Sequence, residues 1–332
     1  GLLLWGSLGC SGGDGGSTTD GGNGGSDGRG TSIDAGSTPI DAAASVDARS
    51  PVDCSSLTAL PITATNLTGF SGSEDFAFDA EGNLASNRDG NVTKQPKTGA
   101  SSLFSPNIGS ETAGTRYLSN GDLIIAQVEN GELLRIRPNG SSDTILTGIA
   151  YPNGVEVDRD DFVYVAEHDA GRIRRVNPNT GAFTVIATGL TNPNGLSFSP
   201  DYKTLYVNSF GGGTIHKITV DAQGAWSSPE LLGDIFDGSG GPGGQRGGLD
   251  GMAVDACGNV YVTEFEVGFI WRFTPEGLRE KVIELPSFWI PNMHWGSGIG
   301  GWDETILYVM DRDEGRLFEL DLGISEKERV FP

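Results

Sequence analysis

An internal repeat constrains the fold of this chain more than any other feature of its sequence. Four segments align on their turns, and each consists of a short apolar run, a tight polar turn and a second apolar run with period-2 alternation. They are residues 76–84, 155–165, 196–207 and 252–262. A weaker copy runs from Arg116 to Ile125, and a last copy ends at residues 305–309. No stretch carries a helical stripe, so the repeated unit is a β-hairpin and the chain from about residue 54 is all-β.

The spacing of the repeats predicts the architecture. Equivalent starting positions are 41, 38, 41, 56 and 42 residues apart, and they are Glu74, Thr115, Asn153, Asn194, Asp250 and Asn292. Periods near 40 with several strands per unit are typical of propeller blades, so six units predict a six-bladed β-propeller. The long interval contains an insertion, residues 237–248, which we expect to be a loop rather than a seventh blade. Residues 61–67 precede the first full unit and are expected to supply the outer strand that closes the last blade.

The residues before the repeats have a different composition. Residues 11–53 are mostly Gly, Ser, Thr, Asp and Ala, so we expect a disordered tether. Residues 1–10 resemble the end of a truncated export signal with a lipoprotein-type cysteine, Cys10; an ordinary signal-peptide end or a chance cysteine is the alternative. We therefore expect three regions, 1–10, 11–53 and the propeller 54–332. The protein is expected to be exported, periplasmic or at the cell surface, with Cys10 as the candidate lipid attachment point to a membrane.

The net charge and the cysteine count exclude several classes of binding partner and of stabilising site. The chain has 22 Lys and Arg against 44 Asp and Glu, a formal net charge of -22. Clustered cations are scarce, so we expect no nucleic-acid partner and no binding to an anionic membrane surface. Three cysteines are too few for a disulfide framework or a Cys-rich zinc site. Cys54 and Cys257 form one disulfide in an oxidising compartment, or remain two buried thiols.

The geometry of a propeller blade predicts where a site would lie. In an antiparallel hairpin the start of the first strand and the end of the second lie at the same edge. If the first strand of each blade lines the central channel, the residues just before it converge on one mouth. The polar side chains best placed to do so are Glu74, Asn153, Asn194 and Asp250. The ends of the second strands are expected near the same rim, at Asn87, Gln127, Glu167, Asn208, Glu264 and Asp311.

Two carboxylates and two amides from four blades form an all-oxygen set. Such a set suits a hard cation, and the size and irregularity of the ring favour calcium over magnesium. No His or Cys pair has the spacing of zinc ligands. Taken singly, each Asn-Gly or Asp-Gly pair is more often a turn than a ligand. Their recurrence at the same phase of successive repeats favours a ligand set, so the sequence predicts one divalent cation, calcium by preference.

Four short motifs also carry a resemblance to known proteins. They are Ser73-Glu74-Asp75, Pro152-Asn153-Gly154, Pro193-Asn194-Gly195 and Leu249-Asp250-Gly251. From roughly residue 70 to the C-terminus the chain resembles the senescence marker protein/gluconolactonase family. The resemblance implies a six-bladed propeller with one divalent cation, usually calcium, in the channel mouth. It also implies hydrolysis of lactones or, in relatives, of phosphoester-like substrates, with the cation polarising the carbonyl, Asp250 as general base, and Glu74, Asn153 and Asn194 holding the metal.

Other side chains are weaker candidates for contacts with a substrate. Arg116 would orient an anionic or polyhydroxylated small molecule, or it is an ordinary surface arginine. His168 would act as a proton shuttle at the rim, or it is only solvated. Three tryptophans in the last unit would stack on a sugar ring or, in the preferred reading, pack between blades: Trp289, Trp295 and Trp302. The alternative to a metal-dependent lactone hydrolase is a non-catalytic binding or scaffold propeller with a structural calcium.

Overall fold

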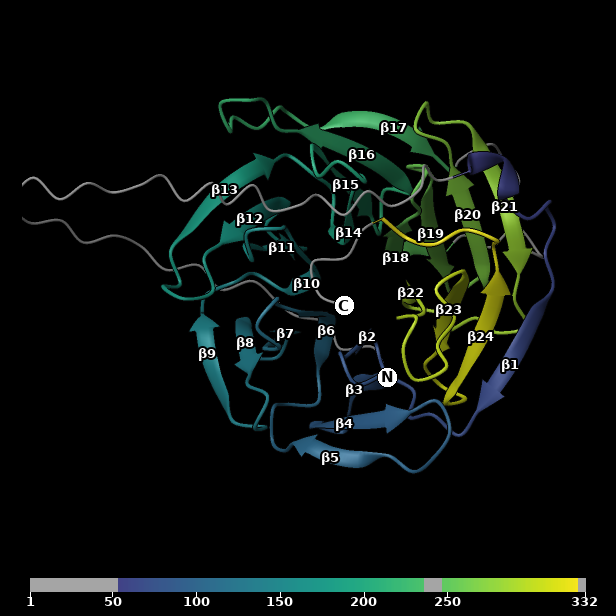
Figure 1. Cartoon of the computed structure of the whole chain (residues 1–332). Helices are drawn as coiled ribbons and strands as arrows, with labels where there is room; N and C mark the ends of the chain where they lie inside the picture. The colour runs from purple at the N-terminus through teal and green to yellow at the C-terminus, as the bar shows by residue number, and fades with distance from the viewer. Residues whose placement is uncertain (1–52, 236–246, 328–332) are drawn as a thin grey trace, which may run out of the picture. The chain divides into compact units, whose positions relative to one another are not determined.

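The computed structural model describes residues 53–235 and 247–327, which hold six four-stranded antiparallel sheets around a central axis (Figure 1). The predicted six-bladed propeller is confirmed, and residues 237–246 of the predicted insertion lie outside the described residues. Helical structure in the described residues is limited to the 3₁₀ turn η1 (Cys54–Ser56), and none of it has the length and apolar character that a membrane span requires. The predicted export signal, Cys10 and all of the predicted linker except Asp53 lie outside the described residues.

The first five blades each use four consecutive strands. Blade 1 consists of β2 (Phe76–Phe78), β3 (Asn83–Arg88), β4 (Asn91–Pro96) and β5 (Ser102–Ser105). Blade 2 consists of β6 (Thr112–Tyr117), β7 (Leu123–Gln127), β8 (Glu132–Ile136) and β9 (Ser142–Leu146). Blade 3 consists of β10 (Pro152–Val157), β11 (Val163–Glu167), β12 (Arg172–Val176) and β13 (Phe183–Thr188). Blade 4 consists of β14 (Pro193–Phe198), β15 (Thr204–Ser209), β16 (Thr214–Thr219) and β17 (Glu230–Asp234). Blade 5 consists of β18 (Gly248–Val254), β19 (Val260–Phe265), β20 (Phe269–Phe273) and β21 (Arg279–Glu284).

The sixth blade joins the two ends of the propeller. It consists of β22 (Met293–Trp295), β23 (Ile306–Asp311), β24 (Arg316–Asp321) and, as its outer strand, β1 (Ala64–Thr68). β1 pairs antiparallel with β24, from Ala64 opposite Leu320 to Thr68 opposite Arg316. The predicted closing strand is therefore confirmed. The innermost strands of neighbouring blades also touch, and β2 contacts both β6 and β22, which completes the ring.

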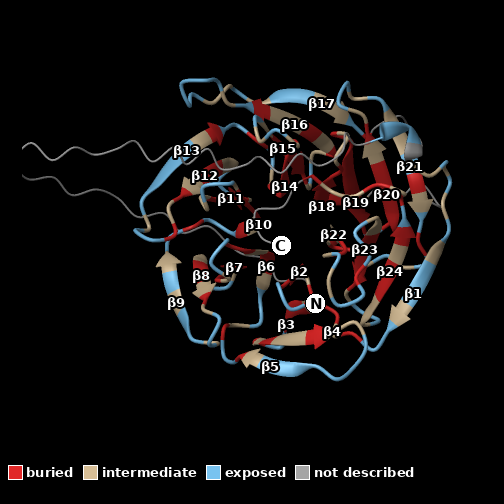
Figure 2. Ribbon diagram, in the orientation of Figure 1, coloured by how far each residue is buried: buried red, intermediate tan, exposed pale blue. Residues whose placement is uncertain are grey.

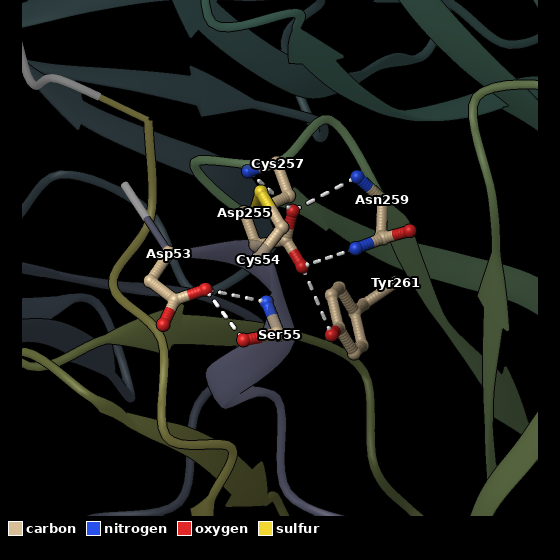
Figure 3. The surroundings of a disulfide bond; sticks show 7 residues. All are labelled: Asp53, Cys54, Ser55, Asp255, Cys257, Asn259 and Tyr261. Carbon is tan, nitrogen blue, oxygen red and sulfur yellow. Dashed lines mark hydrogen bonds between the residues drawn. A yellow bond between two sulfur atoms is a disulfide. The ribbon is translucent and has the colours of Figure 1, made fainter. Parts of the chain in front are cut away.

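A disulfide holds the segment that leads into the closing strand. Cys54 and Cys257 are bonded, with their Cα atoms 5.9 Å apart (Figure 3). Cys257 lies in the turn between β18 and β19, so the bond ties the residues before β1 to blade 5. Of the two alternatives left by the sequence, the structure has the disulfide.

Side chains at the ends of the inner strands explain why the repeated hairpins form. The Oδ1 atom of Asp158 accepts hydrogen bonds from the backbone N–H groups of Asp160 and Phe162, at 3.0 and 2.9 Å. Asp255 does the same in blade 5 and is seen beside the disulfide in Figure 3. An aspartate that accepts from the backbone two and four residues on stabilises a tight turn. This is the physical basis of the polar turn in the sequence repeat.

The apolar core lies mainly between consecutive blades. One cluster combines Tyr261 and Ile270 of blade 5 with Trp295, Leu307 and Phe318 of blade 6. Burial decreases from the centre outwards, since inner and second strands are almost wholly buried whereas the fourth strands are half exposed (Figure 2). The blades thus support one another, and the polar ends of the inner strands are left for the channel mouth.

Candidate functional site

Three of the four predicted ligands lie in β-bulges near the start of the inner strands. The register of β10 shifts between Pro152 and Val155, so that Asn153 and Gly154 oppose a single residue of β11. The same irregularity brackets Asn194-Gly195 in β14 and Asp250-Gly251 in β18. A bulge bends the strand and re-aims its side chain, and bulges are frequent beside active sites. The Asn-Gly and Asp-Gly pairs are therefore bulges within strands and not the hairpin turns that such pairs more often form.

The next strand of the same blade satisfies the backbone of two bulges. The side-chain oxygen of Asn208 accepts from the N–H of Gly195 at 3.1 Å, and its amide nitrogen donates to the carbonyl of Asp250 at 2.6 Å. The hydroxyl of Thr263 accepts from the N–H of Gly251 at 2.9 Å. Asn208, which the sequence placed near the rim, therefore connects blades 4 and 5 and holds the backbone of a predicted ligand.

Glycine is required in these bulges because the inner strands approach one another closely. A Cβ atom on Gly154 would lie 2.0 Å from the carbonyl oxygen of Asn194, and one on Gly195 would lie 2.3 Å from that of Asp250. Both distances are far inside van der Waals contact. The three successive inner strands that carry Asn153, Asn194 and Asp250 are therefore in direct backbone contact.

Both predicted carboxylate ligands have raised pKa values, and the charge of Glu74 contributes to the rise at Asp250. Burial first, and then the negative charge of Glu74, raise the pKa of Asp250 well above its usual range, while a hydrogen bond from the Asn194 side chain opposes the rise. Burial also raises the pKa of Glu74, against the opposing charge of Arg312. Asp250 is only 5% exposed. Two nearby acidic groups in a poorly solvated place favour the binding of protons or of a metal cation.

Arg312 is a site residue that the sequence analysis did not identify. Its Nη1 atom lies 2.8 Å from Oε2 of Glu74, across a separation of 238 residues. Arg312 comes directly after Asp311, which was predicted at the rim, so its position carried a signal even though its residue type did not. Both Arg312 and Glu74 line a cavity of about 480 Å³ that Tyr151 and Asn153 also border.

The donor set fits a hard divalent cation. Carboxylate oxygens of Glu74 and Asp250 and amide oxygens of Asn153 and Asn194 are ligands of the type that calcium takes. Within residues 53–235 and 247–327 no three His, Cys, Asp or Glu side chains are grouped to hold a metal ion. The predicted set contains only two such residues, since its other donors are amides. The observation that supports the fit is that the buried Asp250 carboxyl lies close enough to the negative charge of Glu74 for its pKa to be raised.

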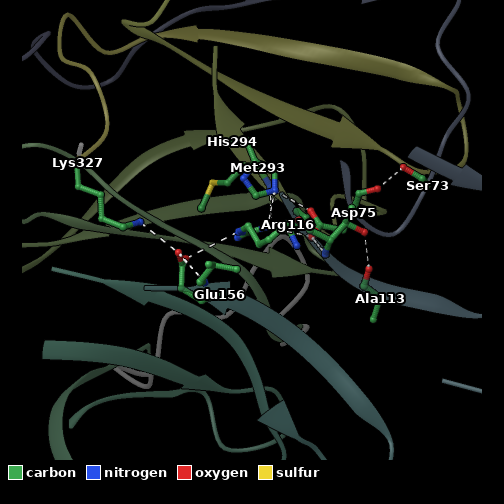
Figure 4. Close-up of polar contacts among 11 residues, drawn as sticks. Ser73, Asp75, Ala113, Arg116, Glu156, Met293, His294 and Lys327 are labelled. Atoms are coloured by element: carbon green, nitrogen blue, oxygen red, sulfur yellow. Dashed lines mark hydrogen bonds and ion pairs between the residues drawn. The ribbon is translucent and has the colours of Figure 1, made fainter. Parts of the chain in front are cut away.

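Arg116 lies in a different environment from these residues. Its guanidinium is 3.2 Å from Oδ2 of Asp75 and 3.9 Å from Oε2 of Glu156, and it also contacts His294 at 3.3 Å (Figure 4). Its side chain is 17% exposed, so Arg116 is not an ordinary surface arginine. Arg116 lines a separate, smaller cavity of about 100 Å³ and does not line the cavity beside Glu74. Its role in binding a substrate stays a prediction.

The internal network around Arg116 was not anticipated from the sequence. Asp75 accepts from the backbone N–H of Thr115 at 2.7 Å and contacts Nε2 of His294 at 2.7 Å. Farther along, Lys327 is 3.7 Å from Glu156, and burial lowers the pKa of Lys327 (Figure 4). Oppositely charged side chains from several blades thus compensate one another inside the propeller.

The remaining rim predictions have clear structural partners. His168 is 2.8 Å from Asp169 through Nδ1, and its ring packs against Tyr151; its role as a proton shuttle stays a prediction. Glu167 is fully buried and bonded to Arg172 and Arg174, so it holds a loop between strands. The other second-strand ends are likewise buried: Asn87, Gln127, Glu264 and Asp311.

The fold defines a class, the six-bladed propeller, and Asn153, Asn194 and Asp250 occupy equivalent bulges in three of its inner strands. Residues 162–312 match the family described as SMP-30/Gluconolactonase/LRE-like region. Over these residues the chain is similar to the SMP-30/gluconolactonase family.

Individual relatives agree with this assignment. The 6-deoxy-6-sulfogluconolactonase of Pseudomonas putida is 30% identical over 153 residues, which are 46% of this chain and 49% of that protein. The chain therefore matches about half the length of the curated relatives. A gluconolactonase structure from Xanthomonas campestris has a TM-score of 0.62 at 20% identity, over 78% of this chain and 90% of that one. The calcium-binding protein regucalcin from Agrobacterium tumefaciens has a TM-score of 0.60 at 19% identity, over 80% and 94% of the two chains. These two structures share the fold.

Proposed function

We propose that the protein is a metal-dependent hydrolase of lactone-type esters and that calcium is its cation. One observation carries the proposal. Burial, and then the negative charge of Glu74 from blade 1, raise the pKa of Asp250 in blade 5, and the Asn194 side chain is hydrogen-bonded to Asp250. A pair of poorly solvated carboxylates supplemented by amide oxygens is the arrangement expected of a cation site.

Each side chain has a role in this proposal. Glu74, Asn153, Asn194 and Asp250 would hold the cation, which would supply Lewis-acid polarisation of the lactone carbonyl. Asp250 would accept the proton of the attacking water. The burial that raises the pKa of Asp250 makes its carboxylate a stronger base than an exposed aspartate, whereas a neighbouring cation opposes that effect. Arg312 offsets the charge of Glu74 and borders the cavity where a substrate would enter.

The relatives support the reaction class and the cation. Two of these relatives are named as lactonases, and the third is named as a calcium-binding protein. Transferring those properties to this chain is part of the proposal, because the sequence match to the curated relatives covers about half their length.

The experiment is hydrolysis of a panel of lactones, followed by acid release at constant pH. The wild-type protein is assayed with calcium and after treatment with a chelator, and Asp250→Asn serves as the matched variant because it keeps the size of the side chain. We expect turnover with calcium, its loss with the chelator, and a loss of at least about 100-fold in kcat for Asp250→Asn. Turnover that is insensitive to both changes would contradict the proposal.

The second candidate function is that of a binding or scaffold propeller. The same experiment distinguishes it from the proposed hydrolase. The second candidate predicts that the protein binds calcium and hydrolyses none of the lactones. The polar cavity of about 480 Å³ beside Glu74 and Asn153 favours an enzyme, since it leaves room for a small molecule next to the proposed ligands.

We also propose that the protein works outside the cytoplasm, in the periplasm or at the cell surface. The disulfide between Cys54 and Cys257 supports this, because such bonds persist in oxidising compartments. Intact-mass measurement of protein from the native cells should show the disulfide and a lipid on Cys10. Reduced Cys54 and Cys257 would contradict export, and an unmodified Cys10 would contradict the lipid anchor.

A further inference from the structure

A wall of neighbouring aromatic side chains lies on blades 3 to 6, and Tyr151 at one end of it lines the cavity beside Glu74. The ring centroids of Tyr151 and His168 lie 5.0 Å apart, and those of His168 and Phe210 lie 6.3 Å apart. The wall continues from Phe210 to Phe265 at 6.4 Å and from Phe265 to Trp289 at 5.1 Å. We call these five residues the aromatic arc. They come from four blades, so the propeller fold is what assembles them.

Both ends of the aromatic arc reach the candidate site. At one end, Tyr151 lines the same cavity as Glu74. At the other end, the guanidinium of Arg312 lies 5.0 Å from the ring centroid of Phe265 and 5.3 Å from that of Trp289, while it is bonded to Glu74. A molecule bound beside Glu74 would therefore meet the ring of Tyr151 and the Arg312 guanidinium that packs against Phe265 and Trp289.

The middle of the arc is built closely onto the strand that carries Asp250. A Cβ atom on Gly248 would lie 2.4 to 2.5 Å from ring carbons of Phe210, so the ring packs directly on the backbone of β18. Gly248 is two residues before Asp250. The backbone of Phe210 is held by a hydrogen bond from its N–H to the carbonyl of Asn192, at 2.9 Å. Only a glycine at position 248 permits this placement of the ring.

The opposite side of the mouth is polar. The cavity wall that blades 1 and 2 contribute contains charged and hydrogen-bonding side chains: Asn87, Arg88, Asp89, Glu111 and Thr112. The mouth is thus asymmetric, with a polar side and an aromatic side that meet at the proposed ligands. We call these ligands the oxygen cluster: Glu74, Asn153, Asn194 and Asp250. Such an asymmetry would orient a ligand that is itself polar at one end and apolar at the other.

We propose that the aromatic arc selects lactones whose ring carries an alkyl or aryl substituent. The inference rests on the proposed lactone hydrolysis. The substituent lies against the arc, and the lactone carbonyl lies at the oxygen cluster. Phenylalanine rings make no hydrogen bonds, so sugar hydroxyls placed against the half-buried ring of Phe210 would lose water without gaining a partner, whereas an alkyl chain gains by leaving water. Successive rings are inclined by 44° to 64°, which forms a wall and not a flat platform for a sugar ring.

The first test compares three substrates with the calcium-loaded protein: γ-butyrolactone, the same ring with a γ-pentyl chain, and glucono-δ-lactone. Burial of about half of a pentyl chain predicts a kcat/KM about 30-fold higher for the pentyl lactone than for γ-butyrolactone, mainly through KM. Glucono-δ-lactone should be the poorer substrate of the two large ones. If γ-butyrolactone and glucono-δ-lactone are hydrolysed and the pentyl chain gives no advantage, the inference fails and the proposed function stands. Hydrolysis of none of the three contradicts the proposed function itself.

The second test locates the discrimination on the arc. Phe210→Ala should lower the ratio of kcat/KM for the pentyl lactone to that for γ-butyrolactone by about 10-fold, and Phe210→Leu should keep most of it. Tyr151→Ser, at a ring that is 46% exposed, should lower the same ratio without disturbing the packing, so the arc stays testable if a Phe210 variant fails to fold. Phe183→Ala, on the outer strand β13 and 44% exposed, is the matched control and should leave the ratio unchanged. A ratio that no arc variant alters would overturn the inference.

Discussion

Gly195→Ala tests whether the close approach of the inner strands sets the geometry of the site. The backbone of Gly195 lies outside the left-handed region, so alanine is not excluded by its own conformational preference. Its Cβ would instead meet the carbonyl oxygen of Asp250 at 2.3 Å. Ordinary contact begins near 3.4 Å, so the two strands must separate by about 1 Å.

The size of the effect follows from that displacement. Overpacking of this kind costs about 1–3 kcal/mol, which corresponds to a fall of about 2–12 °C in Tm for a domain of this size. Because the atom that must move belongs to Asp250, we expect calcium affinity to fall as well. If the proposed function holds, a catalytic group displaced by about 1 Å should lose about 100-fold in kcat/KM.

The assay combines thermal unfolding with calorimetric titration of calcium. Gly211→Ala is the control, since Gly211 lies in the same blade, is exposed, and would place its Cβ 3.1 Å from the side chain of Asn192, which can move. Gly195→Ala should be clearly worse than this control in both measurements. Equal Tm values and equal calcium affinities for the two variants would refute the argument that glycine at position 195 is needed for packing.

Three further predictions follow from contacts around the site and the disulfide. Arg312→Met should raise calcium affinity several-fold in calorimetry, because the guanidinium that competes with a cation for Glu74 is removed; lower affinity would contradict this. The pKa values of Glu74 and Asp250 are raised in the folded protein, so folding favours their protonated forms. Their contribution to the stability of the metal-free protein is fully present below the ordinary carboxyl pKa, near pH 4, and is lost as the pH rises through the raised values. The Tm of chelator-treated protein should therefore fall over that window less in Asp250→Asn than in the wild type, and identical pH profiles would contradict the coupling. Cys54→Ser and Cys257→Ser should each lose about 5 kcal/mol, the loop-closure value for a separation of 203 residues, and unequal losses in denaturant unfolding would point to a role beyond the bond.

The sequence was sufficient to predict the blades because their determinants are local. An aspartate such as Asp158 accepts hydrogen bonds within four residues of itself, and the alternation on either side of it is equally short-range. The same is true of the predicted ligands, since Asn153, Asn194 and Asp250 occupy the same phase of successive repeats. The closing strand β1 was predictable for a different reason, as an apolar segment left over after six units had been counted.

Contacts between blades that are far apart in the sequence were not predictable in the same way. Arg312 reaches Glu74 across 238 residues, and His294 reaches Asp75 across 219, and neither pair has a counterpart in other repeats. No periodicity marks such a pair, because its members are brought together only when the ring closes. For the same reason the sequence grouped Trp289 with other tryptophans of the last unit, whereas the structure places it against Phe265 of blade 5.

We propose that Glu74, Asn153, Asn194 and Asp250 form one divalent-cation site. Calorimetric titration of calcium into chelator-treated protein tests this site directly, with the Glu74→Gln/Asp250→Asn double variant as the comparison. We expect one calcium ion per chain in the wild type and no measurable binding at this site in the double variant. Absence of calcium binding by the wild type, or equal binding by the double variant, would contradict the claim.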